Sequence, residues 1–160
     1  RLFITWRKEQ KRYRCLRKRS TWKKYKRCNK RFEIKKIEDL GYIDGCSEEQ
    51  IKEAEELLDL KFPNEYVEYV KTYGCIDFGS TEWTGLNIKG ELNTVEATLA
   101  ERKYNESFPK KHFVLDDYHI DAKKIIVNEE GEVFLLQYEM VSKVCDSISE
   151  YLEICIDNNR

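Results

Sequence analysis

The segment KFPNEYVEYVKTYG, residues 61–74, decides the fold of this chain. Pro63 suits the first position of a helix, where its missing N–H costs nothing, and Gly74 suits the left-handed residue that ends one. The apolar side chains between them recur at helical spacing on one face: Tyr66, Val67, Val70 and Tyr73. The segment therefore predicts an amphipathic helix over residues 63–73.

A second helix is predicted upstream, over residues 47–59. Ser47 and Gln50 have the spacing of a capping box, in which each side chain accepts a hydrogen bond from the other residue's backbone N–H. The apolar residues that follow keep helical spacing: Ile51, Ala54 and Leu58. The two helices together would bury their apolar faces against a common core.

Strand and helix signals alternate after Gly74. Asn93 and Ser147 have the capping-box spacing and predict helices over about 93–103 and from 147 onward, and Gly131 marks a hairpin turn. The expected strands cover residues 75–79, 82–86, 113–118, 124–127 and 132–138. This order predicts an α+β domain with an antiparallel or mixed sheet and helices packed to one side. The expected core consists of Ile51, Leu58, Tyr66, Val70, Val95, Leu99, Val114, Ile126, Phe134, Leu136 and Leu152.

The charge of the chain is divided between two regions. The 29 basic and 30 acidic residues give a net charge of −1. Residues 1–32 hold 15 Lys or Arg and the single acid Glu9, a charge of +14, so that residues 33–160 carry −15. Such asymmetry is typical of a charged arm attached to a domain. We expect a basic arm at 1–32, either without regular structure or foreign to the native protein, and one domain at 33–160.

The sequence contains none of the local motifs of an enzyme or a metalloprotein. It has no nucleophile elbow, no phosphate-binding loop and no C-x-x-C pair, and its only histidines are His112 and His119. Cys75 follows a helix C-terminus, whose dipole disfavours a thiolate. We therefore expect no catalytic residue, no metal and no cofactor. Scattered cysteines and the lack of a membrane-length apolar segment indicate a reduced, cytoplasmic protein that does not contact a membrane.

Residues 47–85 resemble the SUKH superfamily, the domain shared by yeast cell-wall-synthesis regulators of the Smi/Knr type and many bacterial proteins. The resemblance rests on the L-x-F-P-x-x-Y run at 60–66, on Tyr73-Gly74 and on the glycine-rich loop 79–85. The later elements follow in the family's order, to about residue 157. The family often has two glycines where this chain has Gly74-Cys75. The residues that match the family pattern are expected to serve the fold: Pro63, Tyr66, Gly74 and Gly85.

The resemblance implies a protein-binding module rather than an enzyme. Bacterial members look like immunity proteins, which neutralise a cognate secreted toxin domain, often a nuclease. A domain of charge −15 would attract a basic nuclease, although acidity also serves solubility alone. Trp83 would equally suit the core. The residues expected to contact the toxin are Asp77, Glu82, Trp83, Asp116, Asp117, Tyr118 and Asp121.

Two other functions stay open. The arm would bind nucleic acid if its Lys and Arg displace phosphate counterions and its aromatic side chains stack on bases. Nucleic acid is expected as a partner only through this arm. The domain would instead be a regulatory interaction scaffold if it acts like the yeast members of the family.

Overall fold

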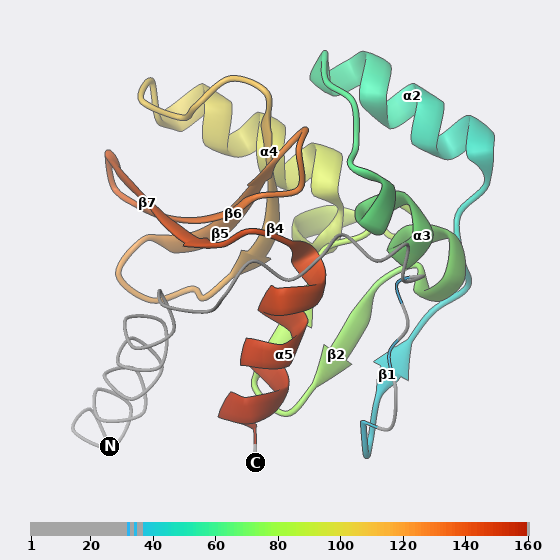
Figure 1. Cartoon of the computed structure of the whole chain (residues 1–160). Coiled ribbons are helices and arrows are strands. Elements are labelled where there is room, and N and C mark those ends of the chain that lie inside the picture. Colours follow the sequence, from blue (N-terminus) through green and yellow to red (C-terminus); the bar gives the residue numbers. More distant parts are fainter. Residues whose placement is uncertain (1–31, 33, 35–36, 160) are drawn as a thin grey trace.

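The computed structural model describes Phe32, Ile34 and residues 37–159, so that the predicted basic arm lies outside the described residues except for Phe32 (Figure 1). The described elements are, in chain order, β1 Gly41–Tyr42, α2 Glu48–Leu58, α3 Asn64–Tyr73, β2 Ile76–Phe78, β3 Thr81–Trp83, the 3-10 helix η1 Gly90–Leu92, α4 Thr94–Tyr104, β4 His112–Asp117, β5 Lys123–Asn128, β6 Val133–Gln137, β7 Met140–Cys145 and α5 Ile148–Asn158.

The seven strands form one antiparallel sheet in the order β1-β2-β3-β4-β5-β6-β7, so that each strand pairs with its neighbours in sequence. The α+β class and the antiparallel sheet are therefore confirmed. Two strands were not predicted, β1 and β7. The strand expected at 82–86 lies instead at Thr81–Trp83, because the chain turns at Gly79-Ser80 to pair β3 with β2.

The two helices predicted from local signals begin and end within one residue of the expected boundaries. Ser47 Oγ accepts a hydrogen bond from the N–H of Gln50 at 3.2 Å, and Gln50 Oε1 accepts one from the N–H of Ser47 at 2.9 Å. Pro63 precedes α3 as its N-cap with an extended backbone, and is not the first helical residue that was predicted, whereas Gly74 ends the helix with a φ of +66°. Asn93 and Ser147 also cap their helices by accepting backbone N–H groups.

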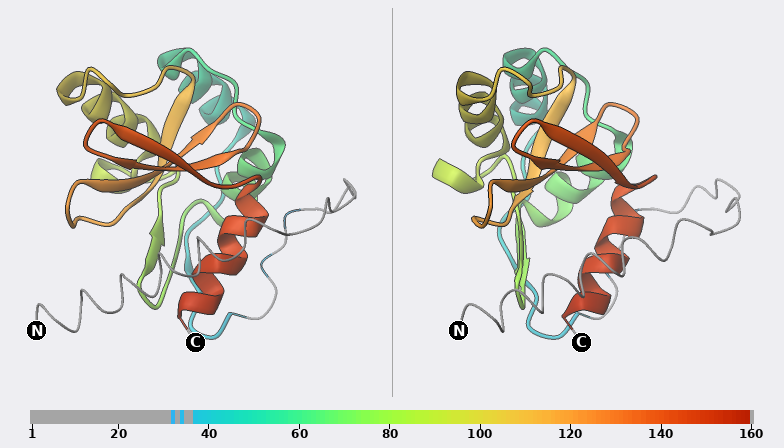
Figure 2. Two further views of the ribbon diagram at one scale, coloured as in Figure 1. Left: turned by 60° about the vertical axis from the view of Figure 1, so that its left-hand side comes forward. Right: turned by 90° about the vertical axis from the view of Figure 1, so that its left-hand side faces the viewer.

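Strands β4 to β6 are covered on both faces. Phe113, Ile125 and Leu135 belong to the main core, where α3 and α5 pack. The alternate residues Val114, Ile126 and Leu136 point the other way and form a second apolar cluster with Ala97 of α4 and Phe108. Figure 2 shows α4 and α5 on opposite sides of these strands. The expectation that all helices pack to one side is therefore wrong for α4, because apolar side chains alternate onto both faces of the sheet.

The buried face of α4 differs from the predicted one. Leu99 was expected in the core but is 41% exposed, and Val95 is half-buried. The buried residues are Thr94 and Thr98. Thr98 Oγ1 accepts a hydrogen bond from the N–H of Val114 at 3.0 Å, which satisfies this buried backbone group of β4. The buried face of α4 is therefore shifted by one residue from the face that hydropathy alone favours, because the buried threonines form hydrogen bonds inside the protein. Of the other predicted core residues, Phe134 is half-buried and the remainder are buried: Ile51, Leu58, Tyr66, Val70, Val114, Ile126, Leu136 and Leu152.

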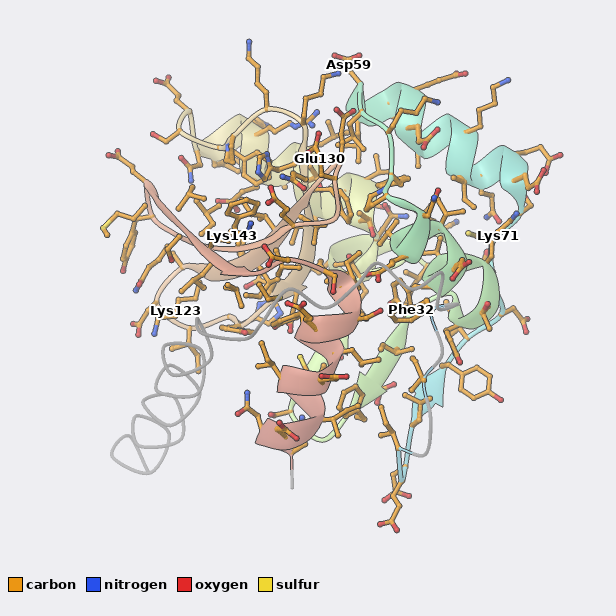
Figure 3. The ribbon with its side chains drawn as sticks, viewed as in Figure 1. Phe32, Asp59, Lys71, Lys123, Glu130 and Lys143 are labelled. Atoms are coloured by element: carbon orange, nitrogen blue, oxygen red, sulfur yellow. The ribbon has the colours of Figure 1, made fainter. Side chains whose placement is uncertain are left out.

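Phe32 packs within the main core, although it was placed at the end of the arm. Its ring lies against Tyr69 and Trp83, with centroids 6.0 and 6.5 Å away. Its N–H donates a hydrogen bond to Glu68 Oε2 of α3 at 2.7 Å, and Figure 3 labels the residue beside that helix. The folded domain therefore includes Phe32.

An ion pair between Glu132, just before β6, and Lys143 of β7 stabilises the β6–β7 hairpin. This carboxylate forms an ion pair with Lys143 and accepts a hydrogen bond from Asn128 Nδ2 at 2.9 Å, while Lys143 also contacts Asp146 at 2.6 Å. The hydrogen bond from Lys143, followed by that from Asn128, lowers the pKa of Glu132. A lowered folded-state pKa stabilises the fold only while the carboxylate is ionised. The contribution is therefore present above about pH 4.3 and is lost as pH falls through the folded-state pKa.

We expect Glu132→Gln to lower the free energy of unfolding at pH 7 by about 1 kcal/mol or less, because water screens this partly exposed ion pair. The deficit should shrink between about pH 5 and pH 2. Urea unfolding followed by circular dichroism at both ends of this range checks the result. Glu130→Gln is the matched control, since Glu130 is an exposed neighbour (Figure 3) and should show no such pH dependence. A deficit that stays constant with pH would contradict the assignment.

Candidate protein-binding site

The outer face of the β2–β3 hairpin carries two opposed carboxylates. Asp77 of β2 lies directly opposite Glu82 of β3, and both side chains are exposed, while their strand neighbours Ile76, Phe78 and Trp83 are buried. Like charges directly opposite one another destabilise a strand pair. Neither carboxylate has an ion-pair or hydrogen-bond partner in the part of the chain that the structure describes. The hairpin therefore presents uncompensated negative charge to its surroundings.

Gly41 of β1 leaves space for the carboxylate of Asp77. Gly41 is paired with Asp77, and a Cβ at Gly41 would lie 2.1 Å from Asp77 Oδ1. A larger residue at position 41 would push the carboxylate away from its present place. Gly41 is therefore part of what positions the candidate site.

Acidic residues also gather around the hairpin at this end of the molecule. Figure 1 shows β1, β2 and the C-terminal part of α5 running to the same end. Asn159, just past α5, accepts a hydrogen bond from the N–H of Ser80 at 2.8 Å and donates one to Thr81 Oγ1 at 2.9 Å. Residues 37–42, 76–83 and 152–159 contain no Lys or Arg. We call this region the acidic end, and its acids are Glu38, Asp39, Asp77, Glu82, Glu153 and Asp157.

Burial and the same two carboxylates affect the pKa of Cys75, the buried thiol just before β2. Burial raises the pKa of Cys75, and the negative charges of Asp77 and Glu82 raise it further. The thiol is therefore protonated at neutral pH, and a thiolate nucleophile is disfavoured at this position. The same conclusion follows from its place after a helix C-terminus.

Trp83 does not lie on the surface. Its side chain is fully buried, stacks on Tyr151 with ring centroids 5.7 Å apart, and meets Tyr69 edge-on at 5.4 Å. The prediction that Trp83 contacts a toxin is wrong for this structure, because β3 ends with Trp83 on the core face of the sheet. Its alternative role as a core residue is the one observed.

Asp116 is likewise buried, with 2% of its surface exposed. The ladder between β4 and β5 shifts between Val114 and Asp116, and this bulge places Leu115 and Asp116 in the core as successive residues. Asp116 Oδ2 accepts a hydrogen bond from the Tyr151 hydroxyl at 3.1 Å. The prediction that Asp116 contacts a toxin is therefore wrong, because the bulge turns its side chain into the core.

The other predicted contact residues lie at the β4–β5 loop, and each has contacts within the chain. Asp117 pairs with Lys124 at 2.6 Å, and Asp121 lies 3.7 Å from Lys123. The Tyr118 hydroxyl shares a hydrogen bond of 2.8 Å with Tyr151. Three residues of the loop have a left-handed backbone: His119, Asp121 and Ala122. These contacts hold the loop in shape, and only Asp121 among the three candidates is largely exposed.

Buried hydroxyl groups form a hydrogen-bond network around Tyr66, one of the family-pattern residues. The Tyr66 hydroxyl lies 2.5 Å from Thr94 Oγ1, which donates to Thr84 Oγ1 at 2.9 Å, and Thr84 donates to the carbonyl of Val114 at 2.8 Å. These hydrogen bonds link α3, α4 and β4 through Thr84, the residue that follows β3. Burial raises the pKa of Tyr66. The Tyr66 hydroxyl is thus part of the internal structure and does not reach the surface.

The two family-pattern glycines lie against one another. A Cβ at Gly85 would stand 1.8 Å from the carbonyl oxygen of Gly74, and a Cβ at Gly74 would stand 2.2 Å from that of Asp44. Gly85 also donates its N–H to Leu92 at 2.9 Å and accepts one from Thr94 at 2.8 Å. Only glycine permits this approach of three backbone segments.

Tyr42 is a candidate that the sequence did not single out. It lies on β1 beside the hairpin, is 65% exposed, and meets Tyr73 edge-on with ring centroids 6.1 Å apart. Exposed tyrosine is one of the residue types that dominate binding hot spots. A strand of two residues has no periodicity, so that no sequence pattern marked Tyr42.

A shallow depression of about 390 Å³ lies between the end of α2 and the β5–β6 turn. Its lining is Glu55, Glu56, Asp59, Leu60, Lys61, Lys111 and Glu129. Its charges largely bond one another: Lys61 pairs with Glu55 at 2.7 Å and Lys111 with Asp59 at 3.2 Å. This hollow is a weaker candidate than the hairpin, whose carboxylates pair with no Lys or Arg among the residues that the structure describes.

Within residues 37–159 and the two described residues before them, no group of three or more His, Cys, Asp or Glu side chains is placed to hold a metal ion. His112 Nδ1 bonds the carbonyl of Lys110 at 2.8 Å at the start of β4, while His119 lies beyond its end, near Asp117. The two histidines are therefore not brought together. None of the described helices has the length and apolarity needed to cross a membrane.

The fold and these residues agree with one protein family. The family profile described as SMI1-KNR4 cell-wall (SUKH_5) matches residues 29–157, a span that contains every described strand, helices α2 to α4 and nearly all of α5. A comparison with curated proteins found no match. Because the profile covers well over half of the sequence, this chain belongs to the SMI1-KNR4 family of the SUKH superfamily.

Proposed function

We propose that this protein is a bacterial immunity protein, which binds a cognate secreted toxin domain and blocks it in the cytoplasm. Membership of the SUKH superfamily supports a role in protein–protein interaction rather than in catalysis. The observation that carries the proposal is the opposed pair Asp77 and Glu82 on the outer face of the β2–β3 hairpin. A partner that brings Lys or Arg to this pair relieves its repulsion, so that binding regains free energy that folding lost.

The chemistry of the acidic end favours a basic partner. Nucleases present Lys and Arg to the phosphates of their substrate, and a nuclease domain therefore meets complementary charge here. Charge complementarity of this kind speeds encounter and excludes wrong partners. The proposed partner is a basic toxin domain of the nuclease class.

Tyr42 supplies the apolar part of the proposed contact. Carboxylates alone give selectivity and fast association, whereas a partly buried aromatic ring gives contact area. Tyr42 stands at the sheet edge next to the strand of Asp77 and already rests on Tyr73. The proposed interface thus combines one aromatic anchor with two acidic residues.

The decisive experiment is co-expression of the full chain with the toxin-like product of a neighbouring gene. We expect restored growth and a stable complex whose association slows as salt rises. The purified toxin domain should lose its activity on addition of the chain. If the chain neither protects cells nor binds any neighbouring gene product, the proposal is wrong.

A further inference from the structure

Among the described strands, β7 lies at one edge of the sheet. It is the last strand in the sheet order, and none of the described strands pairs with its outer side. Its first four residues, 140–143, are exposed, and an irregularity in the β6–β7 ladder follows them. Edge strands are usually protected by proline or by a free charge. Here there is no proline, and the only charged side chain, Lys143, is paired with Glu132 and Asp146.

The turn before β7 determines which backbone groups face outward. Gln137 pairs with Met140 across the two-residue turn at Tyr138 and Glu139. In such a hairpin the flanking pair exchanges its hydrogen bonds, and the next pair along does not. Val141 is in that next pair, opposite Leu136. The N–H and carbonyl of Val141 therefore point away from β6, toward any strand that would join the edge.

Apolar side chains surround this edge. Met140 and Tyr138 are 77% and 63% exposed, and Val141 is 41% exposed. Asn105, just after α4, donates a hydrogen bond to the carbonyl of Tyr138 at 2.8 Å, which brings the exposed Tyr104 to the same corner. Figure 1 shows the β6–β7 turn and the end of α4 on one side of the molecule. Exposed apolar groups beside an open strand edge mark an interaction surface.

The charge of the β7 edge favours a second copy of the chain as its occupant. Residues 33–160 carry −15, yet the β7 sequence MVSKVC contains no acidic residue. Without the arm at 1–32, two copies of this acidic domain would repel each other, and pairing at β7 is the arrangement in which the strand brings no acidic side chain against its partner. An antiparallel pairing centred on Val141 also matches the strand to itself. Val141 would face the partner's Val141, Met140 would face Ser142 of the partner subunit, and Glu139 would stand near the partner's Lys143.

We propose that the chain forms a two-fold dimer in which β7 pairs antiparallel with β7 of a second copy about an axis at Val141. The outward N–H and carbonyl of Val141 then exchange two hydrogen bonds with the partner's Val141. The sheet becomes continuous across both copies. Strands β4 to β6 separate β7 from the β2–β3 hairpin, about 20 Å away at the usual strand spacing. The dimer therefore leaves both acidic ends free, and its failure would not touch the proposed immunity function.

Sedimentation velocity of the full chain tests the dimer. We expect twice the 19.2 kDa mass of the chain at high concentration. Val141→Lys places two like charges opposite each other at the axis and should raise the dissociation constant by about 100-fold. Leu57→Lys is the matched control, because Leu57 is an exposed leucine on α2, away from the edge, and the dimer should persist. Circular dichroism establishes that both variants fold. A wild-type chain that stays monomeric up to about 1 mM overturns the proposal, as does a dimer unaffected by Val141→Lys.

Cross-linking tests the register without adding charge. Residues that exchange both hydrogen bonds have Cα atoms about 5.5 Å apart, within the roughly 4.4–6.8 Å range of a disulfide. In a chain carrying Cys15→Ser, Cys28→Ser and Cys145→Ser, Val141→Cys should form an intermolecular disulfide on oxidation. Ser142→Cys, one residue away from the axis, should do so much more slowly. Equal cross-linking of both variants, or none of either, overturns the proposed pairing.

Discussion

Trp83→Ala should unfold the domain, or leave it only marginally folded. The ring is fully buried, stacks on Tyr151, and is also packed by Tyr69 and Phe32. Truncating a buried aromatic residue lowers the free energy of unfolding by about 3–5 kcal/mol. Domains of this size are stable by roughly 5–15 kcal/mol, so that the loss takes a large share of the total. Urea unfolding of the full chain, followed by circular dichroism, gives the difference directly.

Two companion variants separate packing from other causes. Trp83→Phe keeps most of the buried ring, and Trp83 Nε1 has no hydrogen-bond partner among the residues that the structure describes. We therefore expect a smaller loss than with alanine. Glu82→Ala, the exposed neighbour on β3, should change stability by about 0.5 kcal/mol or less. A folded Trp83→Ala variant of wild-type stability that lost toxin binding would return Trp83 to the surface and contradict its place in the core.

Charge reversal at the hairpin is expected to abolish tight binding of the toxin domain without harming the fold. In the variant Asp77→Lys with Glu82→Lys, the two positions that would meet a basic partner become positive. Like charges brought together across an interface cost several kcal/mol, which corresponds to about a 10²–10³-fold weaker complex. Stability should hold, since neither carboxylate bonds another described residue. Titration calorimetry and growth protection measure the two consequences.

The matched control changes the same net charge elsewhere. Glu53→Lys with Glu56→Lys alters two exposed acids on α2, away from the hairpin. This variant should retain affinity within about tenfold, because only long-range attraction is lost. If both double variants weaken binding equally, total charge rather than the hairpin selects the partner, and the site would have to be reassigned.

Much of the helical structure could be predicted because its signals are local. The capping box of Ser47 and Gln50 and the boundaries at Pro63 and Gly74 depend on residues a few positions apart, and the structure reproduces them to within one residue. The α+β order follows from the same kind of signal. Strand β7 gave no such signal: its first four residues are exposed, so that the sequence had no buried face from which alternation could be recognised.

The surface of the candidate site depended on contacts between distant segments. Asp77 and Glu82 were singled out one by one, but only the pairing of β2 with β3 sets them opposite each other. Likewise, the hydroxyls of Thr94 and Thr98 turned α4 away from the face expected from Val95 and Leu99. Hydropathy could not anticipate this, because the hydrogen-bond partners lie on α3 and β4.

Asp116 and Asp117 show what the sequence determines about this protein and what only its tertiary structure determines. The sequence by itself determined the helix boundaries, the α+β class and the acidity of the domain, since each depends on residue types or on short spacings. It treated these two neighbouring acids alike. The tertiary structure separated them: the β4 bulge buries Asp116 beneath Tyr151 and leaves Asp117 half-buried in an ion pair with Lys124. The face of a strand residue is set by its register with other strands, and that register exists only in the folded chain.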